Sequence, residues 1–169
     1  MTNLSDPKPT YEELEANAQT QQHINLVRKM LRIAAMNLLL RGEMHDISKF
    51  SPEEVKVFAE FTSKLKDTTY NSQEYKACLR EMKPALDHHY ASNRHHPEHH
   101  ENGVSGMNLI DLFEMFVDWL ASTKRHADGD ILRSIEENKE RFGMSDQLVQ
   151  ILRNTARDFK IDPDPIDSI

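Results

Sequence analysis

The sequence lacks several features that would assign it to a familiar class of protein. Its single cysteine, Cys78, excludes an internal disulfide and favours a reducing compartment. No apolar run approaches the ~20 residues of a membrane span, and the longest, Ile33 to Leu40, is bounded by Arg32 and Arg41. The first ten residues lack a basic region followed by an apolar one, so we expect no signal peptide. These absences predict a cytoplasmic protein.

Positive charge is also scarce. The formal net charge is −7, which argues against a partner such as duplex nucleic acid, because binding to phosphate backbones needs a basic face. Apolar residues make up 38% of 169 residues, enough for a chain of this length to bury its own core. We therefore expect a soluble, single domain without membrane or nucleic acid partners.

Glycine is rare, with five in the chain, and apolar residues recur at spacings of three and four. This pattern predicts an all-α fold, a single-domain bundle of about six helices. Residues 1–10 are polar with two prolines and are predicted to be disordered. Residues 11–160 form the predicted helical domain, and residues 161–169 form a proline-containing tail that cannot continue a helix.

The helix boundaries follow from local signals. Gly42 is predicted to end the first helix, and Ser51 to cap the second, with Glu54 completing a capping box. Pro84 is predicted to kink the third helix. The predicted helices span residues 11–41, 51–66, 72–90, 107–125, 130–141 and 145–159.

Histidine is concentrated in one short segment. Residues 87–101 hold six of the nine histidines, and imidazoles and carboxylates are the ligands that borderline divalent metals prefer. A solvated loop, a non-specific chelator or a pH-sensitive surface would have the same composition. The segment contains adjacent histidine pairs whose rings we expect to point in different directions. One ligand per pair is therefore the simplest prediction, with His89 and His96 favoured narrowly over their neighbours.

A second histidine stands beside an acidic residue upstream, in R-G-E-M-H-D-I-S-K-F. His45 and Asp46 could share one cation, each filling one coordination position. The alternative is that Asp46 and Ser48 only turn the chain before the next helix. Lys49 follows at a spacing that would reach a bound phosphate.

Three acidic residues, Asp111, Glu114 and Asp118, are spaced three and four apart on a predicted helix and therefore share one stripe. The alternative is an ordinary solvated face. Asp118, however, lies between Val117 and Trp119, where an unpaired carboxylate would be costly and a bound metal would remove the cost. Asp118 is the leading carboxylate ligand. Asp111 or Glu114 would be a second ligand, a base or a hydrogen-bonding partner.

Several of these stretches resemble a known superfamily. H-I-N-L-V, H-D-I-S-K, the two H-H pairs and V-D-W-L-A-S resemble the HD-domain superfamily of metal-dependent phosphohydrolases, which has a helical core. H-D-I-S-K is similar to the H-D-x-G-K of its phosphodiesterase branches, and H-H-P-E-H-H-E-N-G to the H-H-E…G of its cyclic-dinucleotide phosphodiesterases.

A closer resemblance covers residues 22–155. N-R-H-H-P-E-H, M-N-L-I-D-L-F-E-M, D-G-D-I-L-R-S-I and N-K-E-R-F are similar to stretches of a small, functionally uncharacterised family found in phages and bacteria. No activity is established for this family, so the chemistry that we expect rests on the HD-domain resemblance alone.

The HD-domain resemblance implies one or two divalent metal ions, whether Mn, Fe, Co, Mg, Zn or Ni. It implies a first metal held by His23, His45, Asp46 and Asp118, and a second held by His89 and His96. An unbroken helix from His23 to His45 would separate the two by ~33 Å, so either the chain turns near residues 34–37 or His23 is not a ligand. The short spacing from His89 to His96, and Ser48 in place of a glycine, depart from the superfamily pattern.

The implied activity is hydrolysis of a nucleotide or another small phosphoester by a metal-activated hydroxide. Lys49, Arg94 and Arg125 would neutralise the phosphate, with Arg94 and Arg125 as substrate-binding residues, and Glu114 or Asp111 would handle protons. Ordinary surface charge is the alternative for both arginines.

Two other functions stay open, an HD-type di-iron oxygenase and a non-enzymatic ligand-binding module stabilised by metal. A homo-oligomer also stays open. The helical spacing of Leu148, Ile151 and Leu152 favours a role in the core over one in a dimer contact.

Overall fold

The computed structural model describes residues 8–66, 68, 72–124 and 129–159. Most of the segment predicted to be disordered, the tail 161–169 and Arg125 lie outside these residues. Every regular element in the described ranges is a helix, which confirms the all-α prediction. No helix within those ranges combines the length and the apolar composition that a membrane crossing requires.

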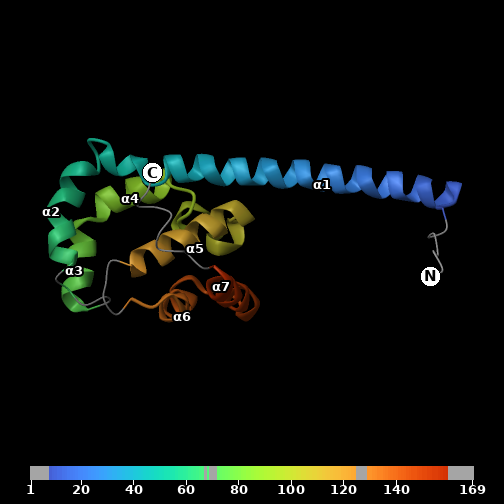
Figure 1. Cartoon of the computed structure of the whole chain (residues 1–169). Helices are drawn as coiled ribbons and strands as arrows, with labels where there is room; N and C mark the ends of the chain where they lie inside the picture. The colour runs from blue at the N-terminus through green and yellow to red at the C-terminus, as the bar shows by residue number, and fades with distance from the viewer. Residues whose placement is uncertain (1–7, 67, 69–71, 125–128, 160–169) are drawn as a thin grey trace. The chain divides into compact units, whose positions relative to one another are not determined.

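The chain divides into two compact units, residues 1–43 and 44–169, and each is considered separately. The first consists of helix α1 (Tyr11–Met44), drawn in blue in Figure 1. This helix continues past Gly42, where the sequence predicted its end, because a glycine in a helix costs only about 1 kcal/mol. The chain instead leaves the helical conformation at Asp46, whose backbone is left-handed with φ 55°. Aspartate tolerates this conformation better than most residues.

The second unit begins with a short 3-10 helix η1 (Ile47–Phe50), followed by α2 (Val55–Lys66), α3 (Gln73–Glu81) and α4 (Lys83–Ser92). The predicted helix over residues 72–90 is therefore two helices that meet at Met82. Pro84 lies in the first turn of α4, where its missing N–H leaves no hydrogen bond unmade. The split makes seven α-helices in the described residues rather than six.

The predicted helix starts at residues 51 and 72 have different outcomes. Ser72 caps α3 by accepting a hydrogen bond from the Tyr75 N–H at 3.1 Å. Ser51 and Glu54 do not form the predicted capping box, because α2 begins only at Val55 and the turn before it directs the Glu54 side chain into the protein, where it is fully buried.

The rest of the second unit contains two short 3-10 helices, η2 (Pro97–His99) and η3 (Gly103–Gly106), and then three longer helices. These are α5 (Leu109–Thr123), α6 (Ile131–Phe142) and α7 (Asp146–Asp158). Side-chain oxygens of Asn108, Asp130 and Ser145 cap their N-termini, and Gly143 ends α6 with a left-handed φ of 60°.

Helices α5, α6 and α7 enclose the main apolar core. Leu152 is buried there, as the sequence predicted, and Leu148 packs against it, whereas Ile151 is exposed. The buried core residues are Phe116, Leu120, Ile135, Met144, Val149 and Leu152. One face of helix α5 packs in this core, and another face of the same helix carries its acidic residues.

Candidate metal centre

Four segments of the second unit bring histidines and carboxylates together. His45 and Asp46 precede η1, His89 lies near the end of α4, and His95 and His96 follow in the loop before η2. Helix α5 adds Glu114 and Asp118. Their donor atoms form three overlapping groups, each with all of its atoms within 4.8 Å of one another. The groups are Asp46, His89, His95 and His96; His45, His95 and Glu114; and His45, Asp46 and Asp118.

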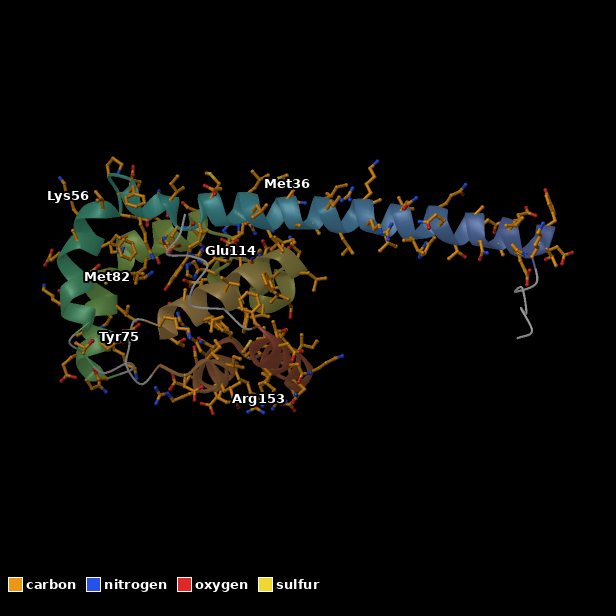
Figure 2. All side chains as sticks on the ribbon, in the orientation of Figure 1. Met36, Lys56, Tyr75, Met82, Glu114 and Arg153 are labelled. Atoms are coloured by element: carbon orange, nitrogen blue, oxygen red, sulfur yellow. The ribbon has the colours of Figure 1, made fainter. Side chains whose placement is uncertain are left out.

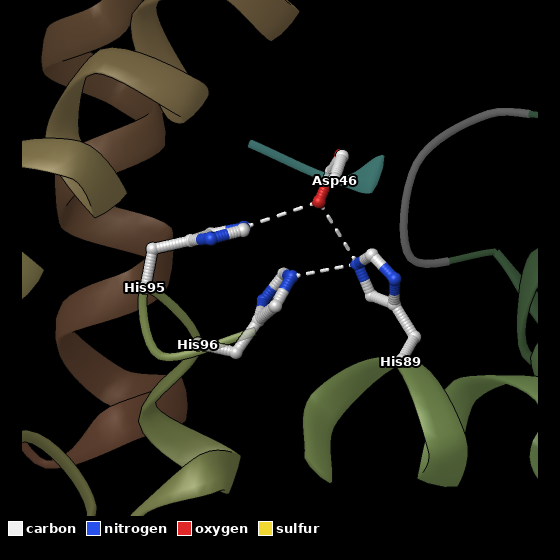
Figure 3. Close-up of side chains that lie close together, drawn as sticks. All are labelled: Asp46, His89, His95 and His96. Atoms are coloured by element: carbon white, nitrogen blue, oxygen red, sulfur yellow. Dashed lines mark hydrogen bonds and ion pairs between the residues drawn. The ribbon is translucent and has the colours of Figure 1, made fainter. Parts of the chain in front are cut away.

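Asp46 is common to two of these groups. Its Oδ1 lies 3.2 Å from Nε2 of His89 and 3.4 Å from Nε2 of His95 (Figure 3). The Nε2 atoms of His89 and His96 are 2.9 Å apart. Two nitrogens bound to one ion at about 2.0–2.1 Å lie ~3 Å apart when the bonds meet at right angles. The spacing of these two nitrogens is therefore compatible with a shared divalent ion.

The other oxygen of Asp46 faces the third group. Oδ2 lies 3.5 Å from Nε2 of His45, and the same nitrogen lies 3.6 Å from Oδ1 of Asp118. The Lys49 ammonium pairs with this oxygen as well. The carboxylate of Asp46 is thus positioned between two sets of nitrogen and oxygen donors.

Two glutamates, Glu54 and Glu114, orient the imidazoles through contacts with their Nδ1 atoms. Glu54 is fully buried, and its two oxygens lie 2.7 Å from Nδ1 of His88 and 2.9 Å from Nδ1 of His89. Oε1 of Glu114 lies 3.0 Å from Nδ1 of His45 and 3.1 Å from Nδ1 of His95. These carboxylates accept hydrogen bonds from the Nδ1–H groups, which leaves the Nε2 atoms of His45, His89 and His95 directed at Asp46 as ligand atoms.

Asn93 supports this tautomer for His89. Its amide donates to Oγ of Ser48 at 2.7 Å and to the His89 carbonyl oxygen at 2.8 Å. Both amide protons are then used, although the same nitrogen also lies 3.1 Å from Nδ1 of His89. The His89 Nδ1 is therefore free to donate its own proton to Glu54.

Electrostatics hold Asp46, Asp118 and His96 in the protonation state that metal binding requires. Burial acts to raise the pKa of Asp46, but the neighbouring His89 and Lys49 outweigh this effect and hold that pKa below its usual range. The pKa of Asp118 is lowered in the same way, by its hydrogen bond to His45. Burial and the neighbouring His95 and His89 lower the pKa of His96 to about 3, so its imidazole is neutral.

His45 differs from these three residues. Hydrogen bonds to Asp118 and Glu114 raise the pKa of His45 to about 10. The ring therefore carries a proton on each nitrogen and a positive charge, which lies between the two carboxylates. Metal binding displaces protons from ligands, and a divalent ion would take the place of this positive charge.

In the group of Asp46, His89, His95 and His96, two buried polar atoms lack a hydrogen-bond partner among the described residues. They are Oδ1 of Asp46 and Nε2 of His95, whose side chain is only 2% exposed. Leaving such atoms buried and without hydrogen bonds is costly. A cation between them would satisfy both, which makes this group the best-supported ligand set.

The structure gathers most of the predicted ligands. His45, Asp46, His89, His96 and Asp118 all belong to the donor groups. His23 does not, because α1 is unbroken from Tyr11 to Met44 and contains no turn near residues 34–37. The turn that the shared ion required is therefore absent from this helix.

The sequence reasoning missed His95, which belongs to two donor groups. The prediction of one ligand per adjacent pair holds on a helix, where neighbouring side chains diverge. His95 and His96 instead lie in a loop, with ring centroids 4.1 Å apart, and both rings face the cluster. No local signal in the sequence distinguished this pair from His88 and His89.

The remaining histidines of the segment have other partners. His88 pairs with Glu54, outside the donor groups. His99 lies 3.0 Å from the Tyr90 carbonyl oxygen, and His100 lies 2.9 Å from the Arg94 carbonyl oxygen. These two imidazoles stabilise the loop that carries His95 and His96.

Arg94 and Asp111 were predicted to act on substrate and protons, and the structure pairs them with each other. The Arg94 guanidinium contacts both oxygens of the fully buried Asp111, at 3.2 and 2.9 Å. Asp111 also accepts from the Asn108 N–H at 3.1 Å and so closes the capping box of α5. This pair connects the loop that carries His95 and His96 to the start of α5. Arg125, the other arginine predicted to bind substrate, lies outside the described residues.

Replacing Arg94 tests this structural role. Arg94→Met removes two donors from a buried carboxylate and should lower the free energy of unfolding by about 2–3 kcal/mol, measured by urea denaturation. Lys83→Met is the matched control, because Lys83 pairs with Asp87 in an exposed position and should matter far less. Equal stability of the two variants would contradict the assigned role.

The chain was also compared with known proteins. Residues 12–158, which include every donor described above, match the model of a protein family described as a family of unknown function (DUF5662). Comparison with curated proteins and with solved structures gave no match. The match covers well over half of the sequence, so the chain belongs to the DUF5662 family.

Proposed function

We propose that this protein is a metal-dependent phosphohydrolase that acts on a small phosphoester, with nucleotides as the first substrate class to test. One observation carries the proposal. Four imidazole Nε2 atoms and the carboxylates of Asp46 and Asp118 converge on one another in the second unit, and two buried atoms of this group lack hydrogen bonds. The sequence resemblance to the HD-domain phosphohydrolases supports the same chemistry.

The donor types narrow the choice of ion. Imidazole nitrogens with carboxylate oxygens suit Zn, Fe, Mn, Co or Ni better than Ca, which prefers oxygen alone. The best-supported binding group contains three histidines and one aspartate, and Asp46 also belongs to a second group. This arrangement supports one ion at Asp46, His89, His95 and His96, and permits a second at His45 and Asp118.

When bound, a divalent ion polarises a phosphoryl oxygen and lowers the pKa of coordinated water toward neutrality. The residues of the chain would complete the site. Lys49 pairs with Asp46 and keeps about a third of its side chain exposed, so its ammonium can face a substrate phosphate. Glu114 orients His45 and His95 through their Nδ1 atoms, a positioning role rather than the catalytic one expected from the sequence.

Substitution of Asp46 tests the proposal. Asp46→Asn is preferred over Asp46→Ala because asparagine also tolerates the left-handed backbone at this position, which keeps the fold intact. We expect wild-type protein, purified without an affinity tag or chelator, to carry one to two equivalents of a transition metal. The variant should lose this metal and at least about 100-fold of any phosphoesterase activity.

Asp87→Asn is the matched control, because Asp87 lies in the same histidine-rich segment, is exposed and pairs with the exposed Lys83. Absence of stoichiometric metal after reconstitution would refute the proposal. Bound iron with oxygen consumption would favour a di-iron oxygenase. Metal that stabilises the fold without turnover of any nucleotide or phosphoester would favour a non-enzymatic module.

A further inference from the structure

The two oxygens of Asp46 have different partners in the structure. Oδ1 is buried and lacks a hydrogen-bond partner among the described residues, with the imidazoles of His89 and His95 at 3.2 and 3.4 Å (Figure 3). Oδ2 has a cationic partner, because the Lys49 ammonium donates to it at 2.5 Å. The chain therefore supplies its own ammonium group on one side of this carboxylate and only imidazoles on the other.

Local structure holds Lys49 in this position. It lies in η1, three residues after Asp46, and in a 3-10 helix side chains three residues apart lie on the same side. Its ammonium also lies 5.3 Å from the centroid of the Phe58 ring on α2, within the range of a cation–π contact. The Phe58 ring packs edge-on against His89, with ring centroids 5.6 Å apart. Two contacts thus place the ammonium beside the donor groups.

The ammonium faces the oxygen that a second ion would need. The third donor group consists of Oδ2 of Asp46, Nε2 of His45 and Oδ1 of Asp118. Glu114, labelled in Figure 2, contacts Nδ1 of the same histidine at 3.0 Å. An ion bound to Oδ2 at about 2.0–2.2 Å would lie within ~5 Å of the Lys49 nitrogen, since that nitrogen is 2.5 Å from the same oxygen. Two positive charges at this separation repel each other strongly.

We propose that Lys49 takes the place of a second metal ion, so that the centre binds one ion, on the Oδ1 side of Asp46. This inference rests on the metal centre of the proposed function and narrows it to a single ion held by Asp46 and three imidazoles. The ammonium supplies the second positive charge of the site. It would face the substrate phosphate, as a second ion does in a two-metal site.

Counting bound ions in variants of Lys49 tests the proposal. Each protein is dialysed against the same free concentration of Mn²⁺, and elemental analysis gives the equivalents bound. We expect one equivalent in the wild type and in Lys49→Arg, which keeps the charge. Lys49→Met should bind two, because its affinity for the second ion should rise at least ~30-fold once the repulsion is removed.

Lys64→Met is the matched control. Lys64 also pairs with a nearby carboxylate, that of Glu60, and lies 4.4 Å from the centroid of an aromatic ring, that of Phe61. It belongs to α2 and contacts none of the donor groups, so this variant should bind one equivalent as the wild type does. Circular dichroism checks that every variant keeps its helix content.

A second readout identifies where an additional ion binds. Two Mn²⁺ ions that share the Asp46 carboxylate lie close enough to couple magnetically. Electron paramagnetic resonance should therefore show a coupled pair in Lys49→Met and a single uncoupled ion in the wild type. Adding Asp118→Asn to Lys49→Met should return the count to one, because it removes a ligand of the second ion.

The outcomes separate this inference from the proposed function. A coupled pair of ions in the wild type would overturn the inference, whether or not Lys49→Met folds, and would leave the proposed function standing. One equivalent in Lys49→Met would do the same. Absence of stoichiometric Mn²⁺ and of any other transition ion from every variant would refute the metal centre itself, and both proposals with it.

Discussion

Saturating Zn²⁺ or Mn²⁺ should raise the free energy of unfolding of chelator-treated protein by about 4 kcal/mol when the free ion stands at ~1,000 times its dissociation constant. The reason is that the donors come from the turn before η1, from α4, from the loop that carries His95 and His96, and from α5, and they come together only in the folded chain. An ion that binds the folded form alone stabilises it by mass action. The ion would also balance the carboxylates of Asp46 and Asp118.

Thermal unfolding followed by circular dichroism measures this effect. For a unit of this size, 4 kcal/mol corresponds to a rise in Tm of about 10 °C or more. Asp46→Asn should show almost no shift at the same free ion concentration, since it removes the shared ligand. Asp87→Asn should shift as the wild type does. An unchanged Tm for the wild type with every transition ion would contradict metal binding at this cluster.

Glu54→Gln should weaken metal binding by about 10- to 100-fold, the usual cost of losing a partner that orients a histidine ligand. Glu54 accepts hydrogen bonds from the Nδ1–H groups of both His88 and His89. An amide offers only one acceptor oxygen, so its NH₂ group must face one of the two rings. If that ring is His89, the imidazole has to turn or change tautomer, and its Nε2 is no longer directed at the ion.

Isothermal titration with Zn²⁺ measures this loss directly. Glu53→Gln is the matched control, because the neighbouring glutamate is exposed and carries the same charge. Urea denaturation of the metal-free proteins separates a loss of ligand orientation from a general loss of stability. Equal zinc affinity of the two variants would show that Glu54 does not orient His89 toward an ion.

The sequence predicted most of the fold because helices depend mainly on local patterns. The apolar spacing of three and four located each long helix, and Ser72, Asp130 and Ser145 cap α3, α6 and α7. The helix ends were harder, since competing signals lie close together. Gly42 allows a helix to end but does not force it, whereas the left-handed conformation of Asp46 ends the helical path.

The candidate site was predictable in its residue types but only partly in its members. His45-Asp46 and the acidic stripe of α5 gave strong signals, because adjacent residues or residues one turn apart share a face. Glu54 and His95 gave no such signal, because their roles depend on contacts with residues far away in the sequence. Glu54 contacts residues at least 34 positions away, and the contacts of His95 with Asp46 and with α5 span at least 19 positions. The local capping pattern around Glu54 even pointed to another role.

Asp46 carries two requirements at once, one from its main chain and one from its side chain. The left-handed turn that ends α1 accepts glycine, asparagine or aspartate readily, while the cluster around it calls for a negatively charged oxygen ligand. Glutamate keeps the charge but strains the turn, asparagine keeps the turn but loses the charge, and glycine loses the ligand. Aspartate alone meets both demands, so this position leaves the chain almost no freedom to vary without changing its architecture or its chemistry.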